Sequence, residues 1–245
     1  MKIGIFDSGI GGLTVLKELI NNKPNNEYIY VGDTLNIPYG NKSREELFKL
    51  STRIIDYLIS KGVDMIIIAC GTVSSNLGNI LKLHYKIPII DIISPTINYL
   101  KNSDYNNIGI IATHMTVKSH IFLNSLKDKS IYEVECPKLV PTIENNLSDI
   151  NNVLNEYLIG FNNKNIDLLV LGCTHYPIVK ENIEKIISVK AFNMATPILD
   201  MIDNSGNKNV SINYTLINDN IINNTKKILN NTYDINLIKL DNNPS

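Results

Sequence analysis

The sequence predicts an α/β fold of two similar lobes, each a mostly parallel sheet flanked by helices, with an active site in the cleft between the lobes. Short apolar runs rich in β-branched residues alternate with segments of helical spacing, which is typical of parallel sheets. The same alternation restarts in the second half of the chain, after about residue 95. Two of the apolar runs lead into Cys70 and Cys173, and ligands bind at the carboxyl ends of parallel strands.

The first half of the chain is expected to form strands separated by helices. The strands, each short and apolar, are predicted at residues 2–6, 28–33, 65–68 and 88–93. A glycine-rich turn over residues 7–12 follows the first strand, and turn-prone residues 36–40 follow the second. Helical spacing covers residues 13–19, 43 to about 60, and 77–83. Ser43-Arg44-Glu45-Glu46 is typical of a capping box, so a helix is expected to begin there.

The second half repeats this pattern. Strands are predicted at residues 107–113, 132–137 and 167–171, with a helix at about 117–126. We expect the first lobe to comprise residues 1–95 plus about 200–245, and the second lobe about 96–199. The boundary is placed near Ser94-Pro95, and the chain is expected to cross back near residues 194–198. The asparagine-rich tail is then expected to add a last helix and strand to the first lobe.

Composition indicates a reduced, globular protein whose partner is a small molecule or another protein. The 245 residues are 44% hydrophobic, which is enough for a substantial core. The formal net charge is −1, so neither a nucleic-acid partner nor an acidic membrane surface is indicated. There is no leader-like segment and no apolar run near the roughly 18–20 residues that span a bilayer, so a cytoplasmic location is expected. The 3 cysteines fit reduced thiols, and no spacing resembles a metal site.

The two cysteine motifs are the strongest indication of chemistry. They are Ala69-Cys70-Gly71-Thr72 and Gly172-Cys173-Thr174-His175-Tyr176-Pro177. A single buried cysteine is usually a small core hydrophobe, but two in matched positions suggest thiols facing one substrate from opposite sides. Such a pair can take a proton from one face of a carbon and return one to the other. A thiolate needs N–H groups, a helix start or a cation to lower its pKa from about 8.5, and the Gly and Thr after each cysteine are predicted to begin such a helix.

Other side chains have two readings from the sequence alone. Asp7 either caps the next helix or acts as a carboxylate in the site, and its motif lacks the third glycine of the dinucleotide fingerprint. His175 either polarises the neighbouring thiol or is a loop bystander. Thr113 and Thr116 either anchor a carboxylate or cap the next helix. The composition around Glu144 alone predicts a solvated charge at a helix start. Cys136 precedes a proline and lacks a helix start, so it is expected to be structural.

Six segments, in order along nearly the whole chain, resemble the glutamate racemase family of the aspartate/glutamate racemase superfamily. They are residues 7–15, 38–40, 69–70, 113–119, 136–144 and 171–177. The first and last segments are the most specific. The Cys-Thr-His-Tyr-Pro sequence of the last resembles glutamate racemases more than aspartate racemases, which tend to carry an acidic residue after Cys-Thr.

This resemblance implies a cofactor-independent, metal-free inversion at the α-carbon of glutamate by two bases. Cys70 and Cys173 would be the bases, with Asp7 supporting the first and Glu144 and His175 supporting the second. The substrate site implied by the resemblance is lined by Asp7, Ser8, Pro38, Tyr39, Gly40, Gly71, Thr72, Thr113, Thr116, Thr174 and His175. The resemblance also implies a cytoplasmic enzyme that supplies D-glutamate for peptidoglycan. Pairing into a homodimer is common in such enzymes.

The chain departs from the family at two places. Gly71 stands where the family has an Asn that helps hold the charged groups of the substrate, and Asn193-Met194 replaces an Asp-Ser pair. A hydrogen bond to a charged group contributes about 1.5–3 kcal/mol, so we expect weaker binding or a shifted substrate preference. Three alternatives therefore stay open: a racemase of aspartate or another amino acid, a binding or regulatory protein without turnover, and a nucleotide-binding Rossmann protein.

Overall fold

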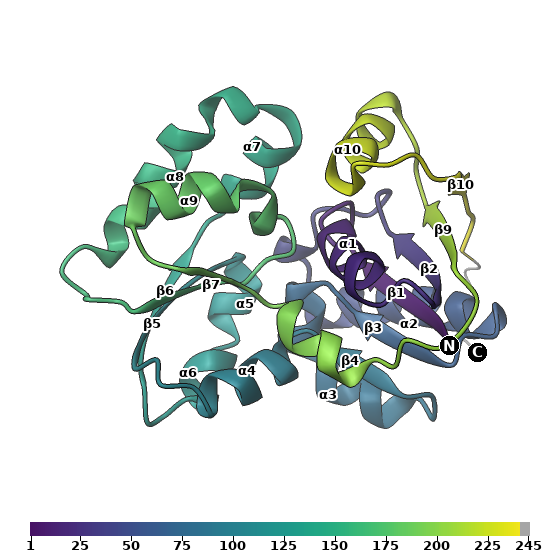
Figure 1. Cartoon of the computed structure of the whole chain (residues 1–245), viewed down its shortest axis with the longest axis horizontal. Helices are drawn as coiled ribbons and strands as arrows, with labels where there is room; N and C mark the ends of the chain where they lie inside the picture. Colours follow the sequence, from purple (N-terminus) through teal and green to yellow (C-terminus); the bar gives the residue numbers. More distant parts are fainter. Residues whose placement is uncertain (241–245) are drawn as a thin grey trace.

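The computed structural model describes residues 1–240, which form two all-parallel sheets (Figure 1). The larger sheet has the order β10-β9-β2-β1-β3-β4 and the smaller one the order β6-β5-β7-β8. The strands of the larger sheet are β1 (Lys2–Asp7), β2 (Glu27–Gly32), β3 (Met65–Ile68), β4 (Ile89–Asp91), β9 (Asn209–Tyr214) and β10 (Ile235–Leu237). Those of the smaller sheet are β5 (Asn107–Ala112), β6 (Ser130–Glu135), β7 (Leu168–Leu171) and β8 (Ala191–Asn193). The predicted fold class is confirmed.

Helices cover the faces of both sheets (Figure 1). In the first lobe they are α1 (Leu13–Asn22), α2 (Arg44–Ser60), α3 (Gly71–His84), α4 (Ile93–Lys101) and α10 (Asp219–Leu229). In the second lobe they are α5 (His114–Lys118), α6 (Ile121–Ser125), α7 (Leu139–Asn145), α8 (Ile150–Leu158) and α9 (Lys180–Ile187). Short 3-10 helices lie at Tyr39–Asn41, Leu147–Asp149, Ile159–Phe161, Tyr176–Val179 and Thr196–Met201. Along residues 1–240, no helix is both long and apolar enough to cross a bilayer.

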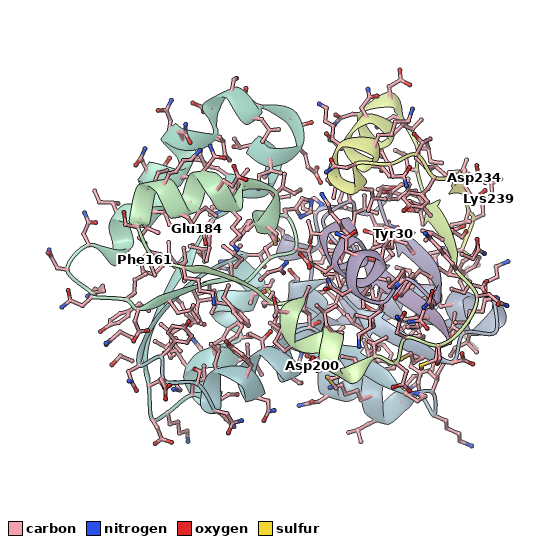
Figure 2. All side chains as sticks on the ribbon, in the orientation of Figure 1. Tyr30, Phe161, Glu184, Asp200, Asp234 and Lys239 are labelled. Carbon is pink, nitrogen blue, oxygen red and sulfur yellow. The ribbon has the colours of Figure 1, made fainter. Side chains whose placement is uncertain are left out.

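The strands are apolar on both faces because helices pack on both sides of each sheet. In β3, Ile67 belongs to one buried cluster while Ile66 and Ile68 belong to another, since successive side chains point to opposite faces. The cluster of Ile67 also contains residues of α4 and of β5 in the second lobe, so the two lobes share part of one apolar core. Side chains fill the space between the ribbons within each lobe, with Tyr30 buried in the first lobe and Phe161 buried in the second (Figure 2).

Several element boundaries differ from the prediction. The helix predicted at 77–83 already begins at Gly71, directly after Cys70. The single helix predicted at 117–126 is two short helices, because His120 adopts a left-handed conformation, with φ of 51°, between them. The strand predicted at 88–93 ends at Asp91, whose carboxylate accepts hydrogen bonds from the N–H groups of Ile93 and Ser94 and so begins α4.

The predicted capping box is confirmed at the start of α2. The Ser43 side chain accepts from the N–H of Glu46, and the Glu46 side chain accepts from the N–H of Ser43. The predicted lobe boundary at Ser94-Pro95 falls inside α4, which is a continuous helix. The division of the chain near residues 95 and 200 stays a prediction, and residues 241–245 of the predicted first lobe lie outside the described residues.

Candidate active site

Cys70 lies at the carboxyl end of β3, in the N-cap position of α3. The side chain is nearly covered, with 4% of the residue exposed. Its thiol lies 3.6 Å from the hydroxyl oxygen of Ser8, to which it donates. Burial raises the pKa of the Cys70 thiol to about 12, and the nearby negative charge of Asp7 adds to this effect. The fold therefore holds Cys70 as a protonated thiol.

Asp7 ends β1 and is fully buried. One carboxylate oxygen accepts from the N–H of Gly9 at 2.9 Å, and the other accepts from the hydroxyl of Thr174, in the second lobe, at 3.2 Å. Burial raises the pKa of Asp7 above its ordinary value, although the charge of His175 and these hydrogen bonds oppose the rise. A Cβ at Gly12 would lie 2.5 Å from the Cβ of Asp7, so only glycine lets α1 begin this close. Asp7 thus touches the second lobe and neighbours the first thiol.

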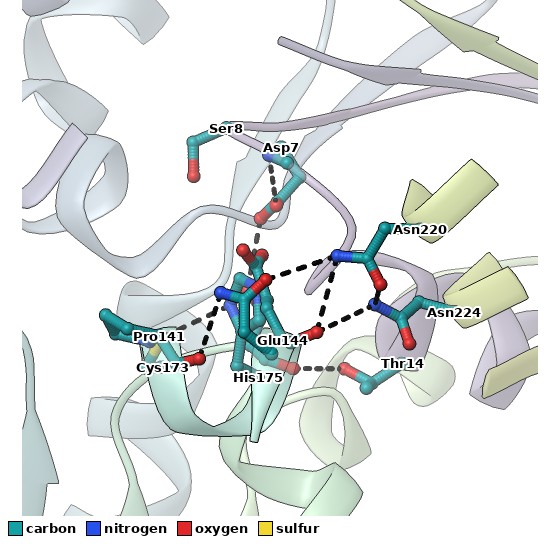
Figure 3. Close-up of polar contacts among 12 residues, drawn as sticks. Asp7, Ser8, Thr14, Pro141, Glu144, Cys173, His175, Asn220 and Asn224 are labelled. Atoms are coloured by element: carbon teal, nitrogen blue, oxygen red, sulfur yellow. Dashed lines mark hydrogen bonds and ion pairs between the residues drawn. The ribbon is translucent and has the colours of Figure 1, made fainter. Parts of the chain in front are cut away.

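Cys173 heads a chain of three interacting side chains at the carboxyl end of β7 (Figure 3). The sulfur lies 3.8 Å from Nδ1 of His175, and Nε2 of His175 lies 2.8 Å from Oε1 of Glu144. Burial lowers the pKa of His175, but the hydrogen bonds to Cys173 and Glu144 outweigh it and raise the pKa to about 10. The ring of His175 therefore lies, charged, between the sulfur of Cys173 and the carboxylate of Glu144. Glu144, which composition alone suggests to be solvated, is partly buried against this histidine.

The helix predicted directly after each cysteine is present at Cys70 but wrong at Cys173. Residues after Cys173 form a turn, and a short 3-10 helix begins only at Tyr176. Pro177 lies in its first turn, where a missing N–H does no harm. The carbonyl of Thr174 instead accepts from the hydroxyl of Thr14 in α1 at 2.8 Å. No helix start lies beside Cys173, and the charged ring of His175 is the nearby positive group instead.

A row of threonine hydroxyls joins the lobes beside Cys70. Oγ1 of Thr72, in α3, lies 3.0 Å from Oγ1 of Thr113, which lies 3.1 Å from Oγ1 of Thr116. Thr113 takes the N-cap position of α5, but its side chain makes no capping hydrogen bond, so the capping interpretation is wrong for this residue. The hydroxyl of Thr113 thus connects the second lobe to Thr72 near the start of α3.

The loop of Pro38, Tyr39 and Gly40 lies against the same threonines. A Cβ built on Gly40 would lie 3.5 Å from the Cβ of Thr113. Tyr39 is buried and donates from its hydroxyl to Oδ2 of Asp33 at 2.6 Å. Burial and the adjacent carboxylate keep the pKa of Tyr39 well above its ordinary value. Pro38 is exposed at the edge of this loop.

The structure thus brings two buried thiols, one from each lobe, to one interface. Cys70 lies near the carboxylate of Asp7, and Cys173 lies near the ring of His175. A family model described as Asp/Glu/Hydantoin racemase matches residues 15–202. The chain belongs to this family. The family match and the relatives described next show that this protein is an amino-acid racemase.

Relatives of this racemase match it over most of their length. A glutamate racemase from Fusobacterium nucleatum is 42% identical, over 81% of this chain and 78% of the relative. A glutamate racemase from Aquifex pyrophilus is 35% identical, over 97% of both chains. A crystal structure of glutamate racemase from Francisella tularensis in complex with D-glutamate superposes with a TM-score of 0.89, at 34% identity and 98% coverage of both chains.

At Gly71 this racemase has no room for the asparagine that the sequence comparison expects. A Cβ there would lie 2.8 Å from the carbonyl oxygen of Gly172 and 3.8 Å from Cε of Met194. A Cβ atom is essentially never found closer than 3.0 Å to such a neighbour, so a side chain at this position would require the backbone of one motif to shift. The two cysteine motifs therefore touch through backbone atoms at this point.

Sequence reasoning missed several residues that contact the candidate site of the racemase. Asp33 holds the Tyr39 loop, Thr14 binds the backbone of the second cysteine motif, and Asn220 and Asn224 contact Glu144. Thr14 lies within the segment 7–15, but its contact with the second lobe is not encoded there. Asp33, Asn220 and Asn224 carry no motif, since an aspartate at a strand end or an asparagine on a helix is common. In the described part of the chain, no three histidine, cysteine or carboxylate side chains are grouped to hold a metal ion.

Proposed function

We propose that this racemase interconverts L- and D-glutamate by cofactor-independent, two-base proton transfer at the α-carbon. The relatives named above are glutamate racemases, and one of them binds D-glutamate in its crystal structure. The observation that carries the proposal is the pair of buried thiols, one from each lobe, whose flanking residues touch at Gly71 and Gly172. The environments of the two thiols differ, because the carboxylate of Asp7 lies near Cys70 and the ring of His175 lies near Cys173.

In one direction, the Cys173 thiolate removes the α-proton from one face of the substrate. The Cys70 thiol donates its own proton to the opposite face, so the carbon inverts and no proton is gained or lost overall. The enzyme is left with a Cys70 thiolate and a Cys173 thiol, which is the form needed for the other enantiomer. His175, held between Cys173 and Glu144, stabilises the thiolate in the first form, and Asp7 lies beside Cys70.

The α-proton of an amino acid is far less acidic than a thiol, so the site must stabilise negative charge on the substrate. Hydrogen-bond donors that are fixed in a water-poor site are the strongest means of doing so. We assign this role to the hydroxyls of Ser8, Thr72, Thr113 and Thr116, together with backbone N–H groups of the Tyr39-Gly40 loop and of Gly71. The Thr174 hydroxyl instead donates to Asp7. Cys70 and Cys173 are 4% and 7% exposed, which supports a site shielded from water.

We further propose that the D-glutamate serves peptidoglycan synthesis in the cytoplasm. A racemase of aspartate is the second candidate, because Gly71 replaces the asparagine of the family and the substrate groups near it are held differently. Both candidates use the same two thiols.

Solvent deuterium incorporation at the α-carbon tests the proposal. Both enantiomers of glutamate and of aspartate are incubated in heavy water with the wild type, Cys70→Ser and Cys173→Ser. We expect exchange with both glutamate enantiomers, and loss or one-sided exchange in the serine variants. Exchange with aspartate alone would favour the second candidate. No exchange with any of the four would leave the binding-protein alternative.

A further inference from the structure

Two asparagine side chains of α10 reach from the first lobe to the end of α7 in the second. Nδ2 of Asn224 donates to the backbone carbonyl of Glu144 at 3.2 Å, and Nδ2 of Asn220 donates to the same carbonyl at 3.4 Å. Asn220 also donates to Oδ1 of Asn145 at 3.3 Å. Figure 3 shows both amides directed at Glu144, and in Figure 1 α10 and α7 stand side by side. These contacts join the C-terminal helix to the residue that bonds His175.

The carbonyl that these asparagines contact is one that the helix itself cannot satisfy. Glu144 is the second-last residue of α7, and the last carbonyls of a helix have no N–H partner within it. Asn145, the last residue of α7, and residues 146–148 are exposed, so no buried side chain directly follows Glu144. The side-chain amides supply the missing donors, and they do so at the backbone of Glu144 itself.

The two asparagines are themselves firmly attached to the first lobe. They lie four residues apart and therefore on one face of α10. Another face of the helix buries Ile221, Thr225 and Ile228, and the Thr225 hydroxyl lies 2.8 Å from that of Tyr214 in β9. Asn224 also donates to Oδ1 of Asn220 at 3.2 Å, so each amide restrains the other.

We propose that Asn220 and Asn224 are positioning residues that hold Glu144 against His175 and so tune proton transfer at Cys173. This inference rests on the roles assigned to Cys173, His175 and Glu144 under the proposed function. The asparagines do not touch the thiol, so they act through the position of the Glu144 carboxylate. The contact also crosses between the lobes, so the carboxylate is held in place only while α10 and α7 are together.

The test compares Asn220→Ala/Asn224→Ala with the matched control Asn223→Ala. Asn223 is exposed on the same helix, and no hydrogen bond of its side chain is found among the described residues. Alanine has a higher helix propensity than asparagine, so neither variant should lose α10. We expect kcat/KM of the double variant to fall roughly tenfold or more in both directions, as misplacement of a catalytic group does, with an unchanged Tm. The control should match the wild type.

Isotope effects separate positioning from general damage. Kinetics are measured with each enantiomer deuterated at the α-carbon. In the double variant the isotope effect should rise for the enantiomer whose proton passes to Cys173, and not for the other, because only that transfer becomes slower. If activity falls but the isotope effect for each enantiomer stays at its wild-type value, the double variant has only a smaller active fraction. That result would overturn the proposal.

A double-mutant cycle with Glu144→Gln tests whether the asparagines act through Glu144. Residues that act through one another give non-additive effects, so adding Asn220→Ala/Asn224→Ala to Glu144→Gln should change kcat/KM little. Additive losses, or a double variant that behaves as Asn223→Ala does, would refute the inference.

A measurement that needs no catalytic activity distinguishes failure of this inference from failure of the proposed function. The ring resonances of His175 are followed by NMR in the wild type, the double variant, Asn223→Ala and Glu144→Gln. We expect the double variant alone to move towards Glu144→Gln. This comparison decides the positioning role even when the wild type exchanges no glutamate proton, a result that would reject only the proposed function.

Discussion

At the scale of single residues, Gly71 matters because it has no side chain at a point where the two lobes meet. The sequence comparison treats it as a lost hydrogen-bonding side chain, whereas in the fold the carbonyl of Gly172 occupies the position that a side chain would enter. A contact between backbones of two lobes can yield only if one lobe moves. The residue therefore sets how closely the two cysteine motifs approach.

We predict that Gly71→Ala and Gly71→Asn each lower kcat/KM by roughly tenfold, because a Cβ 2.8 Å from the Gly172 carbonyl must push the cysteine motifs apart. Steady-state kinetics with glutamate and aspartate provide the measurement. A rise in kcat/KM for Gly71→Asn would show that the missing amide outweighs the steric contact. No change with any substrate would refute both the steric and the hydrogen-bonding interpretation.

The free energy of unfolding depends on pH through the raised pKa of His175. Its pKa rises from an ordinary value of 6.5 to about 10 in the fold, despite burial, because Cys173 and Glu144 favour the charged ring. Between these values the folded state binds a proton that the unfolded state releases. The contribution of His175 to stability is therefore complete below about pH 6.5 and is lost as the pH rises towards 10.

We predict that Glu144→Gln flattens this loss, because it removes one of the two groups that raise the pKa of His175. The difference in the free energy of unfolding between wild type and variant should shrink by more than about 1 kcal/mol from pH 6 to pH 10. Urea unfolding at several pH values measures it. His84→Asn, at an exposed histidine, is the control and should follow the wild type. A pH-independent difference would mean that Glu144 does not favour protonated His175.

At the scale of elements, the loop of Pro38, Tyr39 and Gly40 after β2 is held by one buried carboxylate. Asp33 is fully buried and accepts from the side chains of Tyr39, Thr215 and Asn36, at 2.6, 2.7 and 2.9 Å. Thr215 belongs to the segment after β9, so the C-terminal part of the chain helps to fix the loop. A carboxylate suits this position because it accepts hydrogen bonds and donates none.

We predict that Asp33→Asn raises KM for glutamate severalfold and changes kcat less, because its amide would face three donors and loosen the loop without touching either thiol. Tyr39→Phe should have a smaller effect of the same kind, since it removes one donor and keeps the carboxylate. Measurement of kcat and KM for both variants, with circular dichroism as a folding control, tests this. A fall in kcat with unchanged KM would contradict it.

At the scale of the whole molecule, the lobes are joined by both apolar and polar contacts. One buried cluster contains residues of β1, α4 and β5, and hydrogen bonds connect Thr174 to Asp7 and to Thr14 across the lobes. Breaking one lobe therefore exposes apolar surface of the other.

We predict that the chain unfolds in one cooperative transition. Far-ultraviolet circular dichroism, tyrosine fluorescence and near-ultraviolet circular dichroism should give coincident midpoints in urea. Separate midpoints would show that the lobes unfold independently and that the shared core contributes little.

The class of fold, most of the strands, the start of α2 and the two cysteine motifs could all be predicted from the sequence. These depend on near neighbours: apolar runs predict strands, and Ser43 and Glu46 are three residues apart. The family resemblance named Asp7, Glu144 and His175 as neighbours of the thiols, but their contacts and burial come from the tertiary structure. Glu144 meets His175 across 31 residues and Asn224 across 80, and the conflict of Gly71 with Gly172 exists only when the lobes meet. Burial and hydrogen-bond partners arise from packing of distant segments, which local sequence patterns do not encode.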